Sequence, residues 1–430
     1  MINSEAYDAI VVGSGPGGAT VTRELSKAGK KIALVDWGRH KPLKGNMIQA
    51  VLSIGIPGKS LLFTPDFAAV FRGIISGGSS VFYYGTAFEP PIELFKKYGV
   101  DISKEVMEVG KELPTQPLDD SLVGPMAMKI MHSARELGYD WKKLPKFIYQ
   151  DKCKTECWRC SYGCPHGAKW SGRLFVEQSL ENGADLIPGT RVEKVLIENG
   201  KVVGVEIKKN GRKSRIEAPL VVISAGGIGS PVILNNSGIE GTGKDFFFDP
   251  LIAVMGTTDR IPGGGREIPM ATGIHMEEEG YLMTDMTMTG TLFRAFNVGA
   301  LKPQRLFSHD RTLTIMVKAR DDLGGSLTRR GGVKKRISQE DKNKLNKGFE
   351  RAREILKKAG ARDIYRSMYL AAHPGGTVKI GEVVDSNLQT KTENLYVCDC
   401  SVIPEAWGLP PTFSLVALGK RLARHILDKN

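Results

Sequence analysis

The first 36 residues contain the pattern that most restricts the fold of this chain. An apolar run is followed by a glycine turn, a helix-forming stretch and a second apolar run that ends on an acid. This order predicts a strand, a turn, a helix and a second strand of one parallel sheet. The segments are Asp8-Ala-Ile-Val-Val12, Gly13-Ser-Gly15-Pro-Gly-Gly18, about Ala19 to Ala28, and Ile32-Ala-Leu-Val35 before Asp36.

Each of the three glycines of this G-x-G-x-x-G turn has a physical role in dinucleotide binding. Gly13 allows the tight turn, Gly15 lets the backbone approach a pyrophosphate, and Gly18 lets helix and strand pack closely. The start of the helix offers free N–H groups to phosphates, and Asp36 is placed to accept from a ribose hydroxyl. We therefore predict a dinucleotide site; the alternative is a glycine turn with a purely structural role.

Length and composition point to a globular protein of two packed domains. The chain has 430 residues, of which 41% are hydrophobic and 25% charged, so disordered and fibrous classes are excluded. No run of 18 apolar residues is present, and Met1 to Tyr7 lack the pattern of a signal peptide. We expect no transmembrane segment and a cytoplasmic location.

The net charge is +13, from 60 basic and 47 acidic residues. Two interpretations remain open: a lysine-rich solvated surface, or attraction to an acidic protein or an anionic membrane. Nucleic acid is disfavoured because the basic residues are not interleaved with aromatic ones. The densest basic stretch, Arg329 to Arg336, precedes a Lys/Glu-rich segment from about Ser338 to Lys358 that predicts an exposed helix.

The rest of the chain alternates between two kinds of pattern. Alternating runs near 191–197 and 202–207, a buried run at 220–223 and a second glycine-rich turn predict a β-meander leading into another strand–turn–helix unit. From about 250 to 377 the strand-like segments are rich in methionine, which favours ordinary sheet core over a flexible pocket for an apolar substrate. Residues 394–399 and 412–426 then predict a final strand and helix.

Four motifs together resemble the glucose–methanol–choline (GMC) flavoprotein oxidoreductases, in particular the cholesterol-oxidase and long-chain-alcohol-oxidase branches. They occur in the order of the family and cover nearly the whole chain. The motifs are Asp8 to Asp36; Ser76-Gly-Gly-Ser-Ser80 with Gly85-Thr-Ala-Phe-Glu-Pro90; Arg191-Val-Glu-Lys-Val195 through Ser224-Ala-Gly-Gly-Ile-Gly-Ser-Pro231; and Ala372-His-Pro-Gly-Gly-Thr377 with Asn394-Leu-Tyr-Val-Cys-Asp-Cys-Ser-Val-Ile-Pro404.

The resemblance implies an α/β fold: a discontinuous FAD-binding Rossmann-like domain of glutathione-reductase type, with an inserted α+β substrate domain. The expected FAD-binding domain covers 1–90, 165–250 and 378–430, the substrate domain 91–150 and 251–377, and a cysteine-cluster loop 151–170. It also implies FAD as the dinucleotide. The expected FAD-binding residues are Gly13, Gly15, Gly18, Asp36, Ser79, Ser80, Val195, Ala225, Asp399, Pro411 and Thr412.

The resemblance assigns catalysis to His373, which matches the active-site histidine of the family. A neutral imidazole beside a flavin can accept the hydroxyl proton of an alcohol as hydride leaves. Two positions depart from the family pattern: Pro410 stands where a second His or Asn is usual, and Tyr83 stands where Asn is usual. Proline has no side-chain donor, so we expect Tyr83 or its neighbour Tyr84 to supply a hydroxyl, or the chemistry to differ from alcohol oxidation.

Four cysteines form a cluster: Cys153, Cys157, Cys160 and Cys164, the last followed by Pro165. The spacing C-x3-C-x2-C-x3-C-P is similar to the C-x2-C-x2-C-x3-C-P of bacterial ferredoxins, so we predict a [4Fe–4S] cluster. A [3Fe–4S] cluster, a structural zinc site and simple packing remain alternatives. Cys398 and Cys400 are expected to be small core residues.

These patterns together predict a dehydrogenase. It would oxidise an alcohol or a related small apolar substrate by hydride transfer to FAD. An iron–sulfur cluster would then pass electrons singly to an acidic carrier such as a ferredoxin or an electron-transfer flavoprotein, or to a partner subunit. One alternative reverses the flow, as a ferredoxin-driven reductase of a C=C bond. Another is an electron-transfer subunit of a larger complex, with no substrate of its own.

Overall fold

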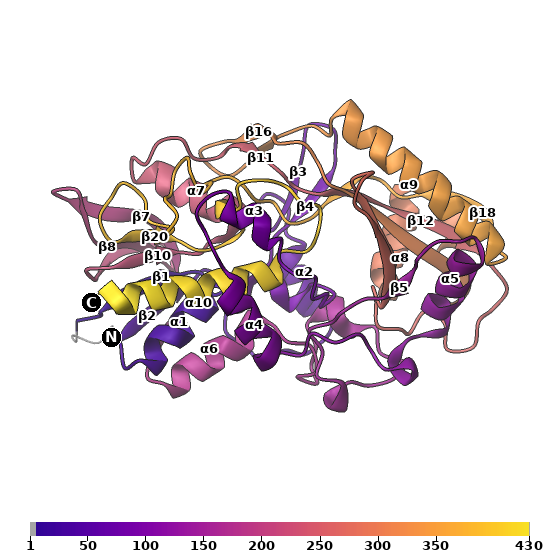
Figure 1. Ribbon diagram of the computed structural model, residues 1–430, viewed down its shortest axis with the longest axis horizontal. Helices are drawn as coiled ribbons and strands as arrows, with labels where there is room; N and C mark the ends of the chain where they lie inside the picture. Colours follow the sequence, from indigo (N-terminus) through magenta and orange to yellow (C-terminus); the bar gives the residue numbers. More distant parts are fainter. Residues whose placement is uncertain (1–5, 430) are drawn as a thin grey trace.

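The structure, a computed structural model, describes residues 6–429 and contains two large sheets (Figure 1). The first is the parallel sheet that the glycine pattern predicts, with strand order β20-β10-β1-β2-β6. Its short strands are buried on both faces, as parallel sheets require. They are β1 (Ala9–Val12), β2 (Ile32–Asp36), β6 (Asp185–Pro188), β10 (Val221–Ile223) and β20 (Leu395–Val397).

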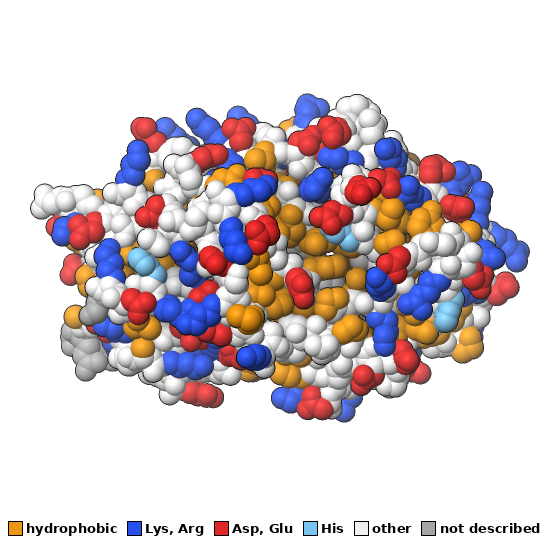
Figure 2. All heavy atoms as spheres, in the orientation of Figure 1, with side chains coloured by type: hydrophobic (Ala, Val, Ile, Leu, Met, Phe, Trp, Pro, Cys, Tyr) orange, Lys and Arg blue, Asp and Glu red, His pale blue; other side chains and the backbone are white. Residues whose placement is uncertain are grey.

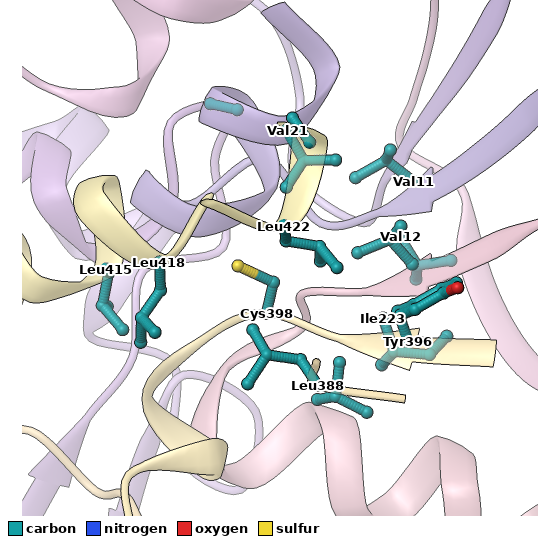
Figure 3. Close-up of a cluster of buried hydrophobic side chains, with 14 of the residues drawn as sticks. Val11, Val12, Val21, Ile223, Leu388, Tyr396, Cys398, Leu415, Leu418 and Leu422 are labelled. Atoms are coloured by element: carbon teal, nitrogen blue, oxygen red, sulfur yellow. The ribbon is translucent and has the colours of Figure 1, made fainter. Parts of the chain in front are cut away.

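Helix α1 (Pro16–Lys27) packs between α6 (Gly172–Glu181) and the C-terminal helix α10 (Thr412–Lys429). Figure 3 shows Leu415, Leu418 and Leu422 of α10 close to Cys398 and the ends of the parallel strands. Cys398 is fully buried there, which confirms its expected place in the core. The sheet and these helices form the largest hydrophobic cluster of the described residues. Their packing fixes the end of β1, where the first glycine turn begins.

The second sheet is mixed and lies at the opposite end of the molecule (Figure 1). Its order is β3-β4-β19-β12-β15-β14-β13-β5, with β18 also paired to β12. The strands are β3 (Leu61–Phe63), β4 (Ala69–Phe71), β5 (Lys142–Lys143), β12 (Pro250–Thr257), β13 (Thr272–Met276), β14 (Tyr281–Asp285), β15 (Thr312–Ala319), β18 (Arg362–Arg366) and β19 (Leu370–Ala371). Strands β3 and β4 thus come from the first 90 residues but pair in this sheet.

The basic segment forms α9 (Gln339–Lys358), and Ser338 caps it by accepting from the N–H of Asp341. Its apolar residues Leu345, Ala352 and Ile355 are buried against β12, β14 and β15, so only the charged face of the expected exposed helix meets solvent. Most methionines of this region are buried, in agreement with the core interpretation, whereas Met276 on β13 is half-buried. Five of them share one cluster with aromatic residues: Met255, Met270, Met286, Met288 and Met316.

Two small sheets and several helices complete the fold. The predicted meander is β7 (Arg191–Glu198), β8 (Lys201–Lys209) and β9 (Arg212–Glu217), and the second small sheet is β11 (Lys244–Phe246), β16 (Gly324–Leu327) and β17 (Val333–Lys334). The remaining helices are α2 (Met47–Ile54), α3 (Ile92–Lys96), α4 (Ser103–Glu112), α5 (Pro125–Glu136), α7 (Gly226–Asn236) and α8 (Gly290–Gly299).

Charged side chains of both signs are interspersed over the face in Figure 2, while apolar side chains gather in the middle of the view. Among the helices of residues 6–429, none is long and apolar enough to cross a membrane. The first five residues, on which the expectation about a signal peptide partly rests, lie outside the described part of the chain.

Candidate active site

A cavity of about 270 Å³ opens where the parallel strands end, the usual ligand position in such sheets. Its walls combine the first glycine turn, the glycine–serine loop, the second glycine turn, the histidine motif and the start of α10. Of the predicted FAD-binding residues, these line it: Gly13, Gly15, Asp36, Ser79, Ser80, Ala225, Asp399, Pro411 and Thr412.

The three glycines of the first turn have different surroundings. Gly13 has φ +96°, and a Cβ there would lie 2.3 Å from the carbonyl oxygen of Ser224. Gly18 faces inward, where a Cβ would lie 2.0 Å from the carbonyl oxygen of Gly13. Gly15, at the uncapped start of α1, has open space on its Cβ side. The turn is therefore packed tightly from behind and open toward the cavity, which suits a pyrophosphate at a helix N-terminus.

Asp36 ends β2 beside this turn, and its carboxylate accepts from Ser14 and Gly38. The backbone N–H of Ser14 lies 2.9 Å from Oδ2, and the Ser14 hydroxyl contacts the same oxygen. Burial raises the pKa of Asp36 to about 6, although these hydrogen bonds favour the charged form. Asp36 therefore shapes the glycine turn directly, in addition to its predicted role toward a ribose.

The glycine–serine loop is joined to the first turn by a hydrogen bond from the N–H of Gly77 to Ser14 Oγ, 2.9 Å long. Ser80 is buried and donates to the carbonyl oxygen of Gly77, whereas Ser79 is exposed to the cavity. Ser79 Oγ accepts from the N–H of Gly73. Both serines line the cavity, with Ser80 holding the loop and Ser79 facing the ligand space, and their binding of FAD stays a prediction.

The second glycine turn and the start of α10 form the wall opposite. Asp399 accepts from the N–H of Gly226 at 2.8 Å and from the Ser230 hydroxyl. Burial raises the pKa of Asp399, and the hydrogen bonds from Ser230 and Ser401 oppose that shift. Because Pro411 and Thr412 line the cavity at the N-terminal end of α10, the positive end of this helix faces the ligand space.

Two predicted positions do not line the cavity. Gly18 lies behind the turn, and Val195 is buried in β7 with its N–H bonded to the Ser237 hydroxyl. Val192 and Arg191 line the cavity from the same strand instead.

Sequence reasoning missed a cationic part of the wall around Trp37. Arg191 and Arg72 lie 5.0 and 5.4 Å from the centre of its ring. Burial and then Arg191 lower the pKa of Arg72 to about 10. These positive groups fit the negative charge of a dinucleotide diphosphate, and the position of Trp37 directly after Asp36 was the available signal.

His373 lines the cavity from the loop after β19, with about 26% of its side chain exposed. Its Nδ1 lies 3.0 Å from Asp249 Oδ2, and that oxygen lies 2.9 Å from the Nζ of Lys318. Sequence patterns gave no indication of Asp249 or Lys318, which are 124 and 55 residues away in the chain. Burial and then Lys318 lower the pKa of His373, so the imidazole is neutral near pH 7.

Tyr83 also lines the cavity, and its hydroxyl donates to the carbonyl oxygen of Trp170 at 2.9 Å. Burial and then Cys160 raise the pKa of Tyr83 well above its ordinary value, so the hydroxyl stays protonated. A catalytic role for it stays a prediction. Pro410 is buried and does not line the cavity.

The cysteine loop lies behind the glycine–serine loop. Cys160 is buried and the other three thiols are half-buried. Burial and then the neighbouring thiols of Cys160, Cys157 and Cys164 raise the pKa of Cys153 to about 12, so the four groups are near one another. Within residues 6–429, however, no three His, Cys, Asp or Glu side chains converge closely enough to hold a metal ion. The predicted metal site is therefore not confirmed.

Two buried lysines flank this loop. Lys169 Nζ donates to the carbonyl oxygens of Val81, Tyr83 and Cys160, and Lys146 Nζ donates to three other carbonyl oxygens. Burial lowers the pKa of Lys146 to about 8, although the charges of Cys160 and Asp285 oppose that shift. Both side chains are at most 6% exposed.

The parallel sheet and the glycine turns at its strand ends define a Rossmann-like dinucleotide-binding protein, with a histidine in the wall of the same cavity. The sequence match is more specific. Residues 8–251 match the N-terminal part and residues 305–419 the C-terminal part of GMC oxidoreductases, so the chain belongs to this family.

Similar proteins span nearly the whole chain. An uncharacterised protein from Methanocaldococcus jannaschii is 29% identical, covering 98% of this chain and 100% of the relative. A long-chain-alcohol oxidase from Arabidopsis thaliana is 22% identical, and the match covers 98% of this chain and 67% of that protein. Pyridoxine 4-oxidase from Mesorbium loti has a TM-score of 0.76 at 15% identity, covering 98% of this chain and 99% of that structure. Formate oxidase from Aspergillus oryzae has a TM-score of 0.78 at 14% identity, covering 100% and 99%.

Proposed function

We propose that this protein is a dehydrogenase that oxidises an apolar alcohol with FAD and passes the electrons, through an iron–sulfur cluster, to an acidic carrier protein. The observation that carries the first half is the place of His373 in the wall of the cofactor cavity. Bound FAD supplies the acceptor for hydride. His373 accepts the hydroxyl proton, and the N-terminal end of α10 stabilises negative charge beside it.

An apolar substrate is supported by the surroundings of His373. Its chain neighbour Ala372 packs against the methionine-rich cluster, as do Tyr84 and Leu409. Phe71, another member of that group, lines the cavity itself. The relatives named long-chain-alcohol oxidases fit the same substrate class.

The test of this half is rapid-mixing measurement of flavin reduction with primary alcohols from 1-butanol to 1-hexadecanol. We expect the rate constant to rise with chain length and to fall by about 10²- to 10⁴-fold in H373Q. The control is the FAD content of H373Q, which should equal that of the wild type. An unchanged rate constant of flavin reduction in H373Q would contradict the proposed role of His373.

The proposed metal site at the cysteine loop is supported by two buried lysines beside it. Lys146 and Lys169 place two ammonium groups in the interior, both bonded to carbonyl oxygens, and Asp285 acts electrostatically on Lys146. Buried charge that is not fully paired is costly. Four thiolates around a [4Fe–4S] cluster or a zinc ion carry a net charge of about −2. Such a site beside the lysines balances them, and the ferredoxin-like spacing favours iron–sulfur over zinc.

The position of the cysteine loop also supports electron transfer. Lys169 Nζ, bonded to the carbonyl oxygen of Cys160, lies 4.8 Å from the centre of the Tyr83 ring, and Tyr83 lines the cofactor cavity. A single layer of residues therefore separates the cysteine loop from the proposed flavin site. A cluster there would take electrons one at a time, which suits a dehydrogenase.

Anaerobic purification with iron, sulfide and zinc assays tests the metal proposal. We expect about four irons per FAD and an electron paramagnetic resonance signal on reduction. Replacement of Cys157, Cys160 or Cys164 by Ser should abolish the cluster, while C398S, in the core, should retain it. Zinc with a flavin spectrum alone would refute the relay and favour oxygen as the acceptor.

The acidic carrier is supported by a surface next to the cysteine loop. Helix α2 contacts the 3-10 helix at Arg159–Tyr162 and leaves an apolar strip exposed. We name this the α2 strip: Met47, Ile48, Val51 and Leu52, each 42–68% exposed. Exposed basic residues of the adjoining segments outnumber the acidic ones, with Lys41, Lys44, Lys152, Lys154 and Arg159 against Asp151 and Glu156. An apolar centre with a basic rim suits an acidic protein.

The double variant I48S/L52S tests this surface with an acidic ferredoxin as the acceptor. We expect the variant to reduce ferredoxin more slowly than the wild type, and more slowly still at high salt. The rate of flavin reduction by the substrate should be unchanged. The matched control is L301S/F307S, which alters two exposed apolar residues elsewhere. Equal loss in both double variants would contradict a docking role for the α2 strip.

A further inference from the structure

The backbone brings His373 of the cavity wall into contact with Asp249. His373 and Asp249 belong to two chain segments that are joined by reciprocal backbone hydrogen bonds between Phe247 and Gly375, of 3.1 and 3.0 Å. Both His373 and Asp249 have left-handed backbone conformations, with φ +52° and +43°. Such conformations are uncommon for residues other than glycine, although Asp and His adopt them more readily than most, and they are often found where the surrounding structure imposes a geometry. Here the imposed geometry brings the imidazole against the carboxylate.

The charges around this pair are specific. Asp249 is 2% exposed and Lys318 is 1% exposed, and their ion pair is 2.9 Å long. Asp249 Oδ1 is buried and has no hydrogen-bond partner in the described structure, so Oδ2 makes both side-chain contacts. Burial alone would raise the pKa of Asp249, but Lys318 and the bond to His373 outweigh it and keep the carboxylate charged.

A second pair holds the backbone of Asp249. Asp321 accepts from the N–H groups of Phe248 and Asp249 at 3.1 and 3.0 Å, and it pairs with Lys335 at 2.9 Å. Asp321 does not contact the imidazole. The other ionisable groups facing this region are Cys400, whose thiol contacts the carbonyl oxygen of His373, and Asp399 and Arg330 on the cavity wall.

We propose that Asp249 and Lys318 are positioning residues that fix His373 as the Nδ1–H tautomer, so that Nε2 is the atom that accepts the substrate proton. This deepens the proposed function and rests on it. Nδ1 has two neighbours of opposite kind: the Asp249 carboxylate, which can only accept, at 3.0 Å, and the Lys318 ammonium, which can only donate, at 3.4 Å. The shorter contact decides the tautomer, so Nδ1 carries the proton and Nε2 keeps its lone pair. Lys318, at 3.4 Å from Nδ1, neutralises Asp249 and disfavours a second proton on the resting imidazole.

The proton and hydride transfers balance together. The O–H bond of the alcohol breaks and its proton goes to Nε2. The C–H bond breaks and both its electrons leave with the hydrogen as hydride, for which bound FAD would be the acceptor, while the electron pair left on oxygen forms the second bond of the C=O product. The imidazole becomes a cation with both nitrogens protonated. Asp249 stabilises this cation through Nδ1–H without taking the proton, as in other histidine–carboxylate pairs.

Nitrogen-15 NMR of histidine-labelled protein tests the tautomer without substrate or FAD. The His373 signals are assigned by their loss in H373Q. We expect the wild type to have protonated Nδ1 and bare Nε2 at pH 8. In D249N we expect the opposite tautomer, because the amide can donate to Nδ1. A bare Nδ1 in the wild type would overturn the proposal, and this readout needs only H373Q to fold, for the assignment.

Flavin-reduction kinetics give the second readout. We expect D249N to lower the rate constant by about 10²- to 10⁴-fold. In K318M the loss of the nearby cation should move the rising limb of the pH–rate profile upward by about one unit or more, with recovery at high pH. E267Q, which removes a buried carboxylate elsewhere, should match the wild type. If H373Q is inactive while D249N keeps full rate and the wild-type tautomer, this inference fails and the proposed function stands.

Discussion

The ammonium group of Lys169 lies 2.8 Å from the carbonyl oxygen of Cys160. Because the same group also bonds to Val81 and Tyr83, one buried cation connects the cysteine loop to the glycine–serine loop of the cofactor cavity. The two loops are therefore a single structural unit.

We predict that K169M destabilises this unit in two ways. Three carbonyl oxygens lose their donor, which should lower the free energy of unfolding of the apo-protein by about 3 kcal/mol. The metal content after anaerobic reconstitution should also fall, since one positive charge beside the thiolates is lost. The matched control is K379M, a buried lysine that pairs with Glu382. Equal metal content in K169M and K379M would contradict the charge-balance argument.

Two glycine variants separate folding from cofactor binding. G18A should destabilise the protein by about 3 kcal/mol, because the new Cβ would lie 2.0 Å from a backbone oxygen. G15A should leave apo-protein stability nearly unchanged, since its Cβ side is open and φ is −63°. We expect G15A nevertheless to weaken FAD binding by 10-fold or more, about 1.4 kcal/mol, by occupying the pyrophosphate space. Denaturant unfolding and fluorescence titration with FAD measure the two effects.

The cations around Trp37 lead to a prediction for cofactor affinity. Arg72 and Arg191 repel each other in the apo-protein, and a diphosphate between them relieves that repulsion. R72M should therefore weaken FAD binding by about 10-fold, or 1.4 kcal/mol, at low salt and by less at high salt. R212M, on the exposed end of β9, is the control. An unchanged dissociation constant in R72M would place the diphosphate elsewhere.

The free energy of unfolding should depend on pH because Glu267 is buried. This carboxylate accepts from the N–H groups of Met126 and Ala127, yet burial raises its pKa from 4.5 to about 7. The folded state then keeps a proton that the unfolded chain releases, so stability falls as pH rises from 4.5 to 7. We expect this loss to reach about 3 kcal/mol. Unfolding of wild type and E267Q at several pH values measures it, and a constant difference between them would contradict the shift.

The parallel sheet and the cofactor turn followed from local patterns in the sequence. Gly13, Gly15 and Gly18 follow β1 and precede β2, two strands that are close in the chain and pair with each other. The predicted α1 and α9 differ from the observed helices by only a few residues. The resemblance located His373 in the same way, since its motif is contiguous. Local hydrogen bonding and apolar periodicity act over these short distances, so the sequence alone suffices for them.

The partners of these residues depended on tertiary structure. Asp249 and Lys318 meet His373 only because β12 and β15 pair in the second sheet and the segment near 247 bonds to the loop near 375. Likewise Val195, expected at the cofactor, is turned into the core of the meander, while Val192 faces the cavity. Contacts between residues far apart in the chain carry no periodicity or motif. Burial and charge pairing decide them when the sheets assemble.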